Sequence, residues 1–109
     1  MRTHRIEDFL GGWVIGNFTP SILHSEEIEV GVKFMPAGSR EDMHYQLTAT
    51  EITIVTSGHC SLGQVELRSG DIAVIEPMEA AEFLAIEDTV LVVVKNPSLP
   101  SDKVVGSPI

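Results

Sequence analysis

Three polar residues in one short segment have the types and spacing to bind a ligand or a metal ion. His44, Gln46 and Glu51 lie beside a run of Ile, Val and Thr, where a polar side chain that becomes buried needs a partner. His44 and Gln46 are two residues apart, so both leave the same face of a strand. Glu51 follows at an odd offset, so a turn must intervene if the three are to converge. An imidazole, an amide oxygen and a carboxylate together are a donor set suited to a divalent metal.

The elements that must position these residues are predicted to be β-strands. Apolar and β-branched runs alternate with glycine turns along most of the chain. The predicted strands are residues 28–34, 51–56, 59–61, 64–67, 72–75, 82–86 and 89–95. Many short strands of this kind predict a sandwich or a barrel.

The spacing of the polar residues resembles the first sequence motif of the cupin family. The segment Gly38–Gly58 reads G-x5-H-x-Q-x4-E-x6-G and departs from that motif in one position, where glutamine stands for a second histidine. The segment Gly70–Pro77 is similar to the first half of the second motif. The resemblance extends over roughly residues 30–97 and implies an all-β fold, the jelly roll or double-stranded β-helix barrel.

The second motif departs from the family pattern at its metal ligand. Counted from Gly70, the third histidine of the family falls on Ala81, whereas counted from Pro77 it falls on Glu82. We favour Glu82, which has an oxygen to offer a metal. The metal ligands that the resemblance then implies are His44, Gln46, Glu51 and Glu82. Such a set suits Mn, Fe, Mg or Ni better than Zn and would hold the ion loosely, at low occupancy.

Three functions are compatible with this pattern. The first is a binding module in which His44, Gln46 and Glu51 contact a small polar molecule and the metal site is degenerate; no catalytic residue is assigned. The alternative is a metal-dependent enzyme, an oxygenase, isomerase or lyase acting on a small polar organic acid or sugar. A third reading is a purely structural dimer with a filled barrel and no pocket, in which the three polar residues hydrogen-bond one another without a metal.

The resemblance implies a single cupin domain over residues 1–109. Its barrel core is expected at about residues 28–97, after an N-terminal arm of residues 1–27. The Pro- and Ser-rich tail, residues 98–109, is expected to run over the surface. Residues 90–94 are apolar on both faces of a strand, so the outer face needs a cover. Either a homodimer or the segment around Trp13 and Phe18 could supply it.

Composition and charge exclude several classes of partner. Seven Lys and Arg against sixteen Asp and Glu give a net charge of −9, which repels nucleic acid and anionic membrane surfaces. No apolar run approaches the roughly 20 residues that span a bilayer. The charged N-terminal segment lacks the apolar block of a secretory signal. Cys60 has no partner for a disulfide within the chain, so we expect a cytoplasmic protein.

Overall fold

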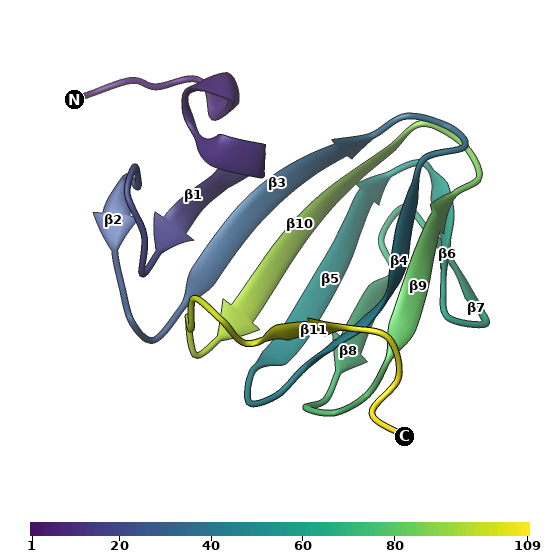
Figure 1. Ribbon diagram of the computed structural model, residues 1–109. Helices are drawn as coiled ribbons and strands as arrows, with labels where there is room; N and C mark the ends of the chain where they lie inside the picture. The colour runs from purple at the N-terminus through teal and green to yellow at the C-terminus, as the bar shows by residue number, and fades with distance from the viewer.

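Two facing β-sheets make up nearly the whole molecule (Figure 1). The computed structural model describes all 109 residues and confirms the all-β jelly roll. Two short 3₁₀ turns, Ile6–Asp8 and Leu10–Gly12, precede the first strand. The strands are β1 (Trp13–Gly16), β2 (Leu23–His24), β3 (Glu29–Met35), β4 (Arg40–Gln46), β5 (Thr50–Ser57), β6 (His59–Leu62), β7 (Val65–Arg68), β8 (Ile72–Ile75), β9 (Ala81–Ala85), β10 (Thr89–Asn96) and β11 (Lys103–Val105). No helix has the length and apolar character needed to cross a membrane.

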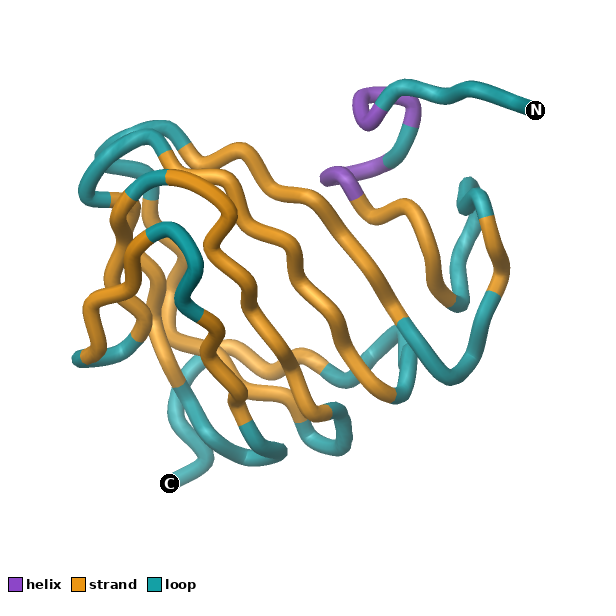
Figure 2. Tube along the Cα trace, turned by 180° about the vertical axis from the view of Figure 1, so that it is seen from behind, coloured by secondary structure: helices purple, strands orange, loops and turns teal.

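The strand order brings the ends of the chain into the sheets. Sheet A has the order β2-β1-β3-β10-β5-β8, and sheet B has the order β11-β4-β9-β6-β7. Figure 2 shows the strands of both sheets from behind. The predicted hairpin of β6 and β7 is confirmed, and Gly63, at a φ of 59°, occupies its two-residue turn. The predicted strands around β5, β8, β9 and β10 are present as well.

The inner face of sheet A changes from charged to apolar along β10 and β5. Residues directly opposite one another on neighbouring antiparallel strands share a face. Three successive cross-strand rows run through β3, β10 and β5: Glu29–Lys95–Glu51, Gly31–Val93–Thr53 and Lys33–Leu91–Val55. One end of the interior is therefore polar, and the other is suited to a hydrophobic core.

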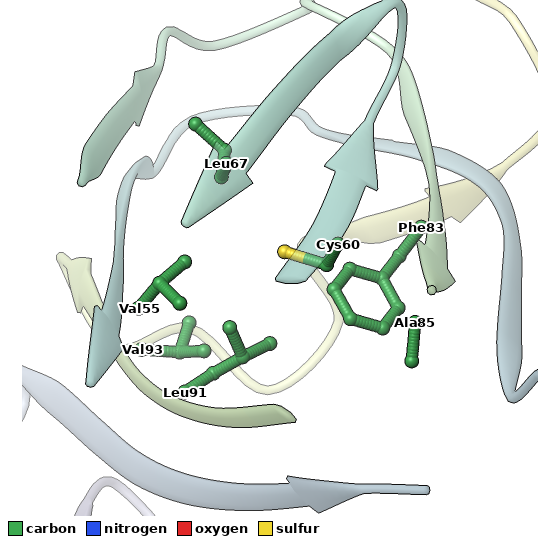
Figure 3. Close-up of a cluster of buried hydrophobic side chains, with 7 residues drawn as sticks. All are labelled: Val55, Cys60, Leu67, Phe83, Ala85, Leu91 and Val93. Atoms are coloured by element: carbon green, nitrogen blue, oxygen red, sulfur yellow. The ribbon is translucent and has the colours of Figure 1, made fainter. Parts of the chain in front are cut away.

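The hydrophobic core occupies the apolar end of the interior. Its buried members come from both sheets and surround the Cys60 thiol (Figure 3): Val55, Cys60, Leu67, Phe83, Ala85, Leu91 and Val93. Val55 and Cys60 are fully buried. Apolar side chains of this kind stabilise a fold by roughly 1.5–3 kcal/mol each when they leave water, so this cluster fixes how the two sheets pack.

The outer face of sheet A is apolar on β3, β10, β5 and β8, where it has no charged residue. Cross-strand pairing places on this outer face Val30, Val32, Phe34, Ile52, Ile54, Ile72, Val74, Val90, Val92 and Val94. The proposed cover by the segment around Trp13 and Phe18 is wrong, because both residues line the interior instead. Phe34, Ile72 and Val74 remain exposed in the single chain.

The C-terminal segment does not run freely over the surface, as its Pro and Ser content led us to expect. Lys103–Val105 forms β11, which pairs with β4 and extends sheet B. Asp102, which is buried, accepts hydrogen bonds from the backbone N–H groups of Thr48 and Ala49. The tail is therefore tied to the turn between β4 and β5, by a pairing between segments far apart in the sequence.

Candidate functional site

A cavity of about 440 Å³ lies between the two sheets at their polar end. His44 and Gln46 reach it from β4 in sheet B, and Glu51 reaches it from β5 in sheet A. The turn between β4 and β5 carries the chain from sheet B to sheet A, so all three side chains can face the same interior despite the odd spacing of Glu51. Phe83, Leu91 and Val93 belong to both the core and the cavity lining. The filled-barrel reading is therefore wrong, because the interior is hollow where the polar residues meet.

A β-bulge in β4 orients His44. Glu41 pairs with Phe83 and His44 pairs with Ala81, so β4 has one more residue than β9 over this stretch. The bulge allows Glu41 and His44 to line the same cavity despite their odd spacing. The Nδ1 of His44 lies 2.9 Å from the carbonyl oxygen of Asp42. Because a carbonyl can only accept, Nδ1 is the donor in this contact, and in the neutral imidazole Nε2 has its lone pair available to a ligand.

Gln46 is the strongest sign of an absent binding partner. Its side chain lines the cavity although the residue is only 3% exposed, and its amide nitrogen Nε2 has no hydrogen-bond partner. A buried donor left unpaired costs about 1–3 kcal/mol. A mutual network in which Gln46 donates to Glu51, as the filled-barrel reading required, is not formed. The amide nitrogen is therefore left without an acceptor in the free chain, at a residue that lines the cavity.

Glu51 already has partners within sheet A. Its Oε2 accepts a hydrogen bond from the Thr53 hydroxyl at 3.2 Å. Lys95 is its direct cross-strand neighbour on β10 and forms an ion pair with Glu29 at 3.8 Å. The carboxylate therefore faces the cavity next to an ammonium group, which lowers its attraction for a second cation.

The fourth predicted ligand lies elsewhere. Ala81 is the cross-strand partner of His44 and lines the cavity, so the count from Gly70 gives the correct register. Glu82, which we favoured, is the next residue of β9; it is exposed and is not part of the lining. One residue's difference moves a side chain to the opposite face of a strand.

The donors present do not fit a tightly held divalent ion. Nowhere in the chain do three His, Cys, Asp or Glu side chains gather as a metal site requires. A methyl group stands at the position of the third histidine, and Lys95 adjoins the one carboxylate of the set. A histidine and an amide with an engaged carboxylate provide too few strong ligands.

Sequence reasoning missed the cations and the aromatic wall of this cavity. Lys33 and Lys95 both lie over the ring of Trp13, with Nζ 4.4 Å and 4.9 Å from its centroid. The Lys33 ammonium also donates to the carbonyl of Gly11 at 2.6 Å. Burial lowers the pKa of Lys33, and the nearby Glu41 partly opposes this effect. The available signal in the sequence was a lysine in each of two predicted strands, Lys33 and Lys95, in a chain that is otherwise strongly acidic.

Three other side chains with metal-ligating or nucleophilic atoms lie outside the cavity. Cys60 is buried in the core, and burial raises the pKa of its thiol, so it is held in its inert form. His59 is buried in the hairpin and pairs with Glu66 at 3.1 Å. His24 is exposed, on the short edge strand β2. None of these residues lines the cavity.

Comparison with known proteins identifies the architecture. No protein-family model and no curated protein matches the sequence. Among solved structures, an uncharacterized conserved protein with a double-stranded β-helix domain from Klebsiella pneumoniae superposes with a TM-score of 0.73 at 18% identity, over 97% of this chain and 92% of that one. An RmlC-like cupin from Shewanella frigidimarina gives a TM-score of 0.61 at 16% identity, over 69% and 70% of the two chains.

A third structure is bacterial pirin YhhW from Escherichia coli in complex with nickel(II). It gives a TM-score of 0.67 at 14% identity, over 80% of this chain but only 39% of pirin. At these identities the likeness concerns the fold rather than the activity. These structures and the present chain share one architecture, and the chain has a double-stranded β-helix fold like theirs.

Proposed function

We propose that this protein is a binding module that holds a small polar molecule in the cavity between its sheets, and that its metal site is degenerate. The observation that carries the proposal is the unpaired amide nitrogen of Gln46, buried at the wall of a 440 Å³ cavity. The lone pair of His44 Nε2 and the carboxylate of Glu51 supply acceptors in the same space. Small-molecule sites commonly have this composition, an apolar wall with a few converging polar groups.

Replacing Gln46 with leucine separates binding from folding. Leucine removes the unpaired donor, so we expect Gln46→Leu to raise the free energy of unfolding by about 1 kcal/mol or more, while ligand binding is lost. Binding is measured by NMR titration of a small-molecule library against the labelled protein, with shifts mapped onto the cavity residues. Gln64→Leu, in the exposed turn of the β6–β7 hairpin, is the matched control. A Gln46→Leu protein that is destabilised, or that binds every hit unchanged, contradicts the proposal.

A metal-dependent enzyme is the second candidate. The protonated Nδ1 of His44 favours it, because a metal-ligating histidine typically donates its other nitrogen to a carbonyl or carboxylate. Titration of chelator-treated protein with Mn, Ni, Fe(II) and Zn, followed by atomic emission, distinguishes the two. The binding module predicts weak, substoichiometric uptake. Tight one-to-one binding that is lost in His44→Ala, with turnover lost in Glu51→Gln, would establish the enzyme instead.

A homodimer formed through the outer face of sheet A completes the proposal. This face presents ten apolar side chains and no charge, whereas the whole chain carries −9, so it is where two copies can meet without strong repulsion. Sedimentation velocity should find a dimer in the wild type and a monomer in Val92→Glu, which places a charge at the centre of the face. Val65→Glu, on the exposed β7, should remain dimeric. A monomeric wild type at about 100 μM, a loading far above the Kd of a stable dimer, refutes the interface.

A further inference from the structure

All three lysines of the chain line the same cavity. Lys33 lies on β3, Lys95 on β10 and Lys103 on β11, so both sheets contribute. Gathering ammonium groups is unfavourable unless an anion is close to them. This grouping occurs in a chain in which acidic residues outnumber basic ones by sixteen to seven. Four acidic residues, Glu29, Glu41, Glu51 and Glu79, line the cavity with them, so its formal charge is −1, while the rest of the chain carries −8.

Two of these lysines already have partners within the chain. Lys95 pairs with Glu29 at 3.8 Å, and both side chains are largely buried. Lys33 donates to the Gly11 carbonyl and lies on the Trp13 ring. Lys103 forms no ion pair and is exposed at the edge of sheet B. Lys103 is thus the ammonium group that remains available to a bound molecule.

Lys103 lies beside the unpaired amide of Gln46. The two residues are direct cross-strand partners of β11 and β4, so their side chains leave the same face of sheet B, and both line the cavity. An amide N–H and an ammonium group are both donors, and one of them is charged. A carboxylate, with two acceptor oxygens and a negative charge, complements this pair.

The acidic residues of the cavity are less available for a cationic ligand. Glu29 is paired with Lys95, and Glu51 accepts from Thr53 and adjoins Lys95 on β10. Glu79 uses Oε1 to accept the backbone N–H of Glu76. Glu41 makes no hydrogen bond, but it lies close enough to Lys33 to raise the pKa of that ammonium. The unpaired buried group of the cavity is a donor, which requires an acceptor from the ligand. An anionic acceptor therefore suits the cavity better than a cation does.

The rest of the lining is apolar and aromatic. Trp13 and Phe18 from the N-terminal part of the chain face the cavity, as do Leu99 and Pro100 just before β11. We propose that the cavity binds an organic carboxylate, with its carboxylate group on Gln46 and Lys103 and its apolar body against the wall that contains Trp13. This inference rests on the proposed function, since it specifies the class of small molecule that the binding module takes.

Matched probes test the charge preference. Phenylacetate and its neutral amide, phenylacetamide, have nearly the same shape, as do octanoate and octanamide; phenethylamine is the cationic counterpart. Isothermal titration of the intact chain should give a Kd for each acid at least about tenfold lower than for its amide, the ratio that one charged hydrogen bond of about 1.4 kcal/mol confers. Lys103→Gln should reduce this ratio to about threefold or less. Arg68→Gln, exposed on β7 outside the cavity, makes the same charge change and should leave the ratio unaltered.

The outcomes separate the inference from the function on which it rests. An amide that binds as tightly as its acid, or an amine that binds more tightly, overturns the carboxylate inference and leaves a small-molecule binding protein. Equal losses in Lys103→Gln and Arg68→Gln assign the preference to net charge and overturn the role of Lys103. If none of the probes binds, the carboxylate inference fails, and the library titration of the wild type and Gln46→Leu decides the proposed function.

Discussion

Removing the carboxylate of Asp102 should release the tail from the turn that brings the cavity residues together. Its Oδ1 and Oδ2 lie 2.9 Å and 3.1 Å from the backbone nitrogen of Thr48, and Oδ2 lies 2.8 Å from that of Ala49. Ala49 is 1% exposed, so its N–H cannot recruit water in place of the carboxylate, whereas Thr48 is exposed and can. A hydrogen bond to a charged group contributes about 1.5–3 kcal/mol.

We therefore expect Asp102→Ala to lower the free energy of unfolding by about 3 kcal/mol, most of it from Ala49. Because a chain of this size has a urea m-value near 1.5 kcal/mol/M, the unfolding midpoint should fall by about 2 M. Asp102→Asn keeps one acceptor oxygen and should lose about half as much. Asp102→Ala should also weaken acid binding, because it loosens the strand that carries Lys103.

The control for this prediction is Asp42→Ala. Asp42 is exposed, and its side chain makes no hydrogen bond, so the change in net charge is matched without loss of a contact. Equilibrium urea unfolding followed by tryptophan fluorescence measures all three variants. A midpoint for Asp102→Ala within error of the Asp42→Ala midpoint would refute the view that this carboxylate anchors the tail.

Three further predictions concern single residues. Gly58→Ala should lower the free energy of unfolding by at least about 2 kcal/mol more than Gly70→Ala does, as measured by denaturant unfolding. Both glycines have positive φ angles, but only at Gly58 would a Cβ lie 2.2 Å from a backbone oxygen, that of Asp88; equal losses would contradict this explanation. Cys60 should react with Ellman's reagent only at the rate of unfolding, since burial raises its thiol pKa; rapid reaction in the native protein would count against it. Burial lowers the pKa of Lys33 from its ordinary 10.5, so the unfolded chain binds more protons at alkaline pH. The stability of the wild type relative to Lys33→Met should therefore rise as the pH increases toward 10.5; a flat difference would show that this ammonium is not desolvated.

The strands that could be predicted from the sequence are those whose residues have a high intrinsic preference for the β conformation. β5, β8 and β10 are rich in β-branched residues, and glycine marks the hairpin turn between β6 and β7. β4, with the sequence REDMHYQ, has little intrinsic preference for a strand and is held by pairing with β9 and β11. β11 is three residues long in a Pro- and Ser-rich tail, and no local pattern indicates it.

The facing of the strands was not predictable from alternation alone. In β3 the apolar face lies outside, while Glu29, Gly31 and Lys33 face inward, the reverse of the usual pattern for a half-buried strand. The convergence of His44, Gln46 and Glu51 on one interior followed from their spacing. The choice between Ala81 and Glu82 depended on a register that only the pairing of β4 with β9 determines.

The positions of β1 and β11 separate ligand selectivity from structural integrity. Trp13 and Lys103 are contributed by the first and last strands, whereas the hydrophobic core is built from β5, β6, β7, β9 and β10. A substitution of Lys103, which is exposed, can thus change what the protein recognises while the core is left intact.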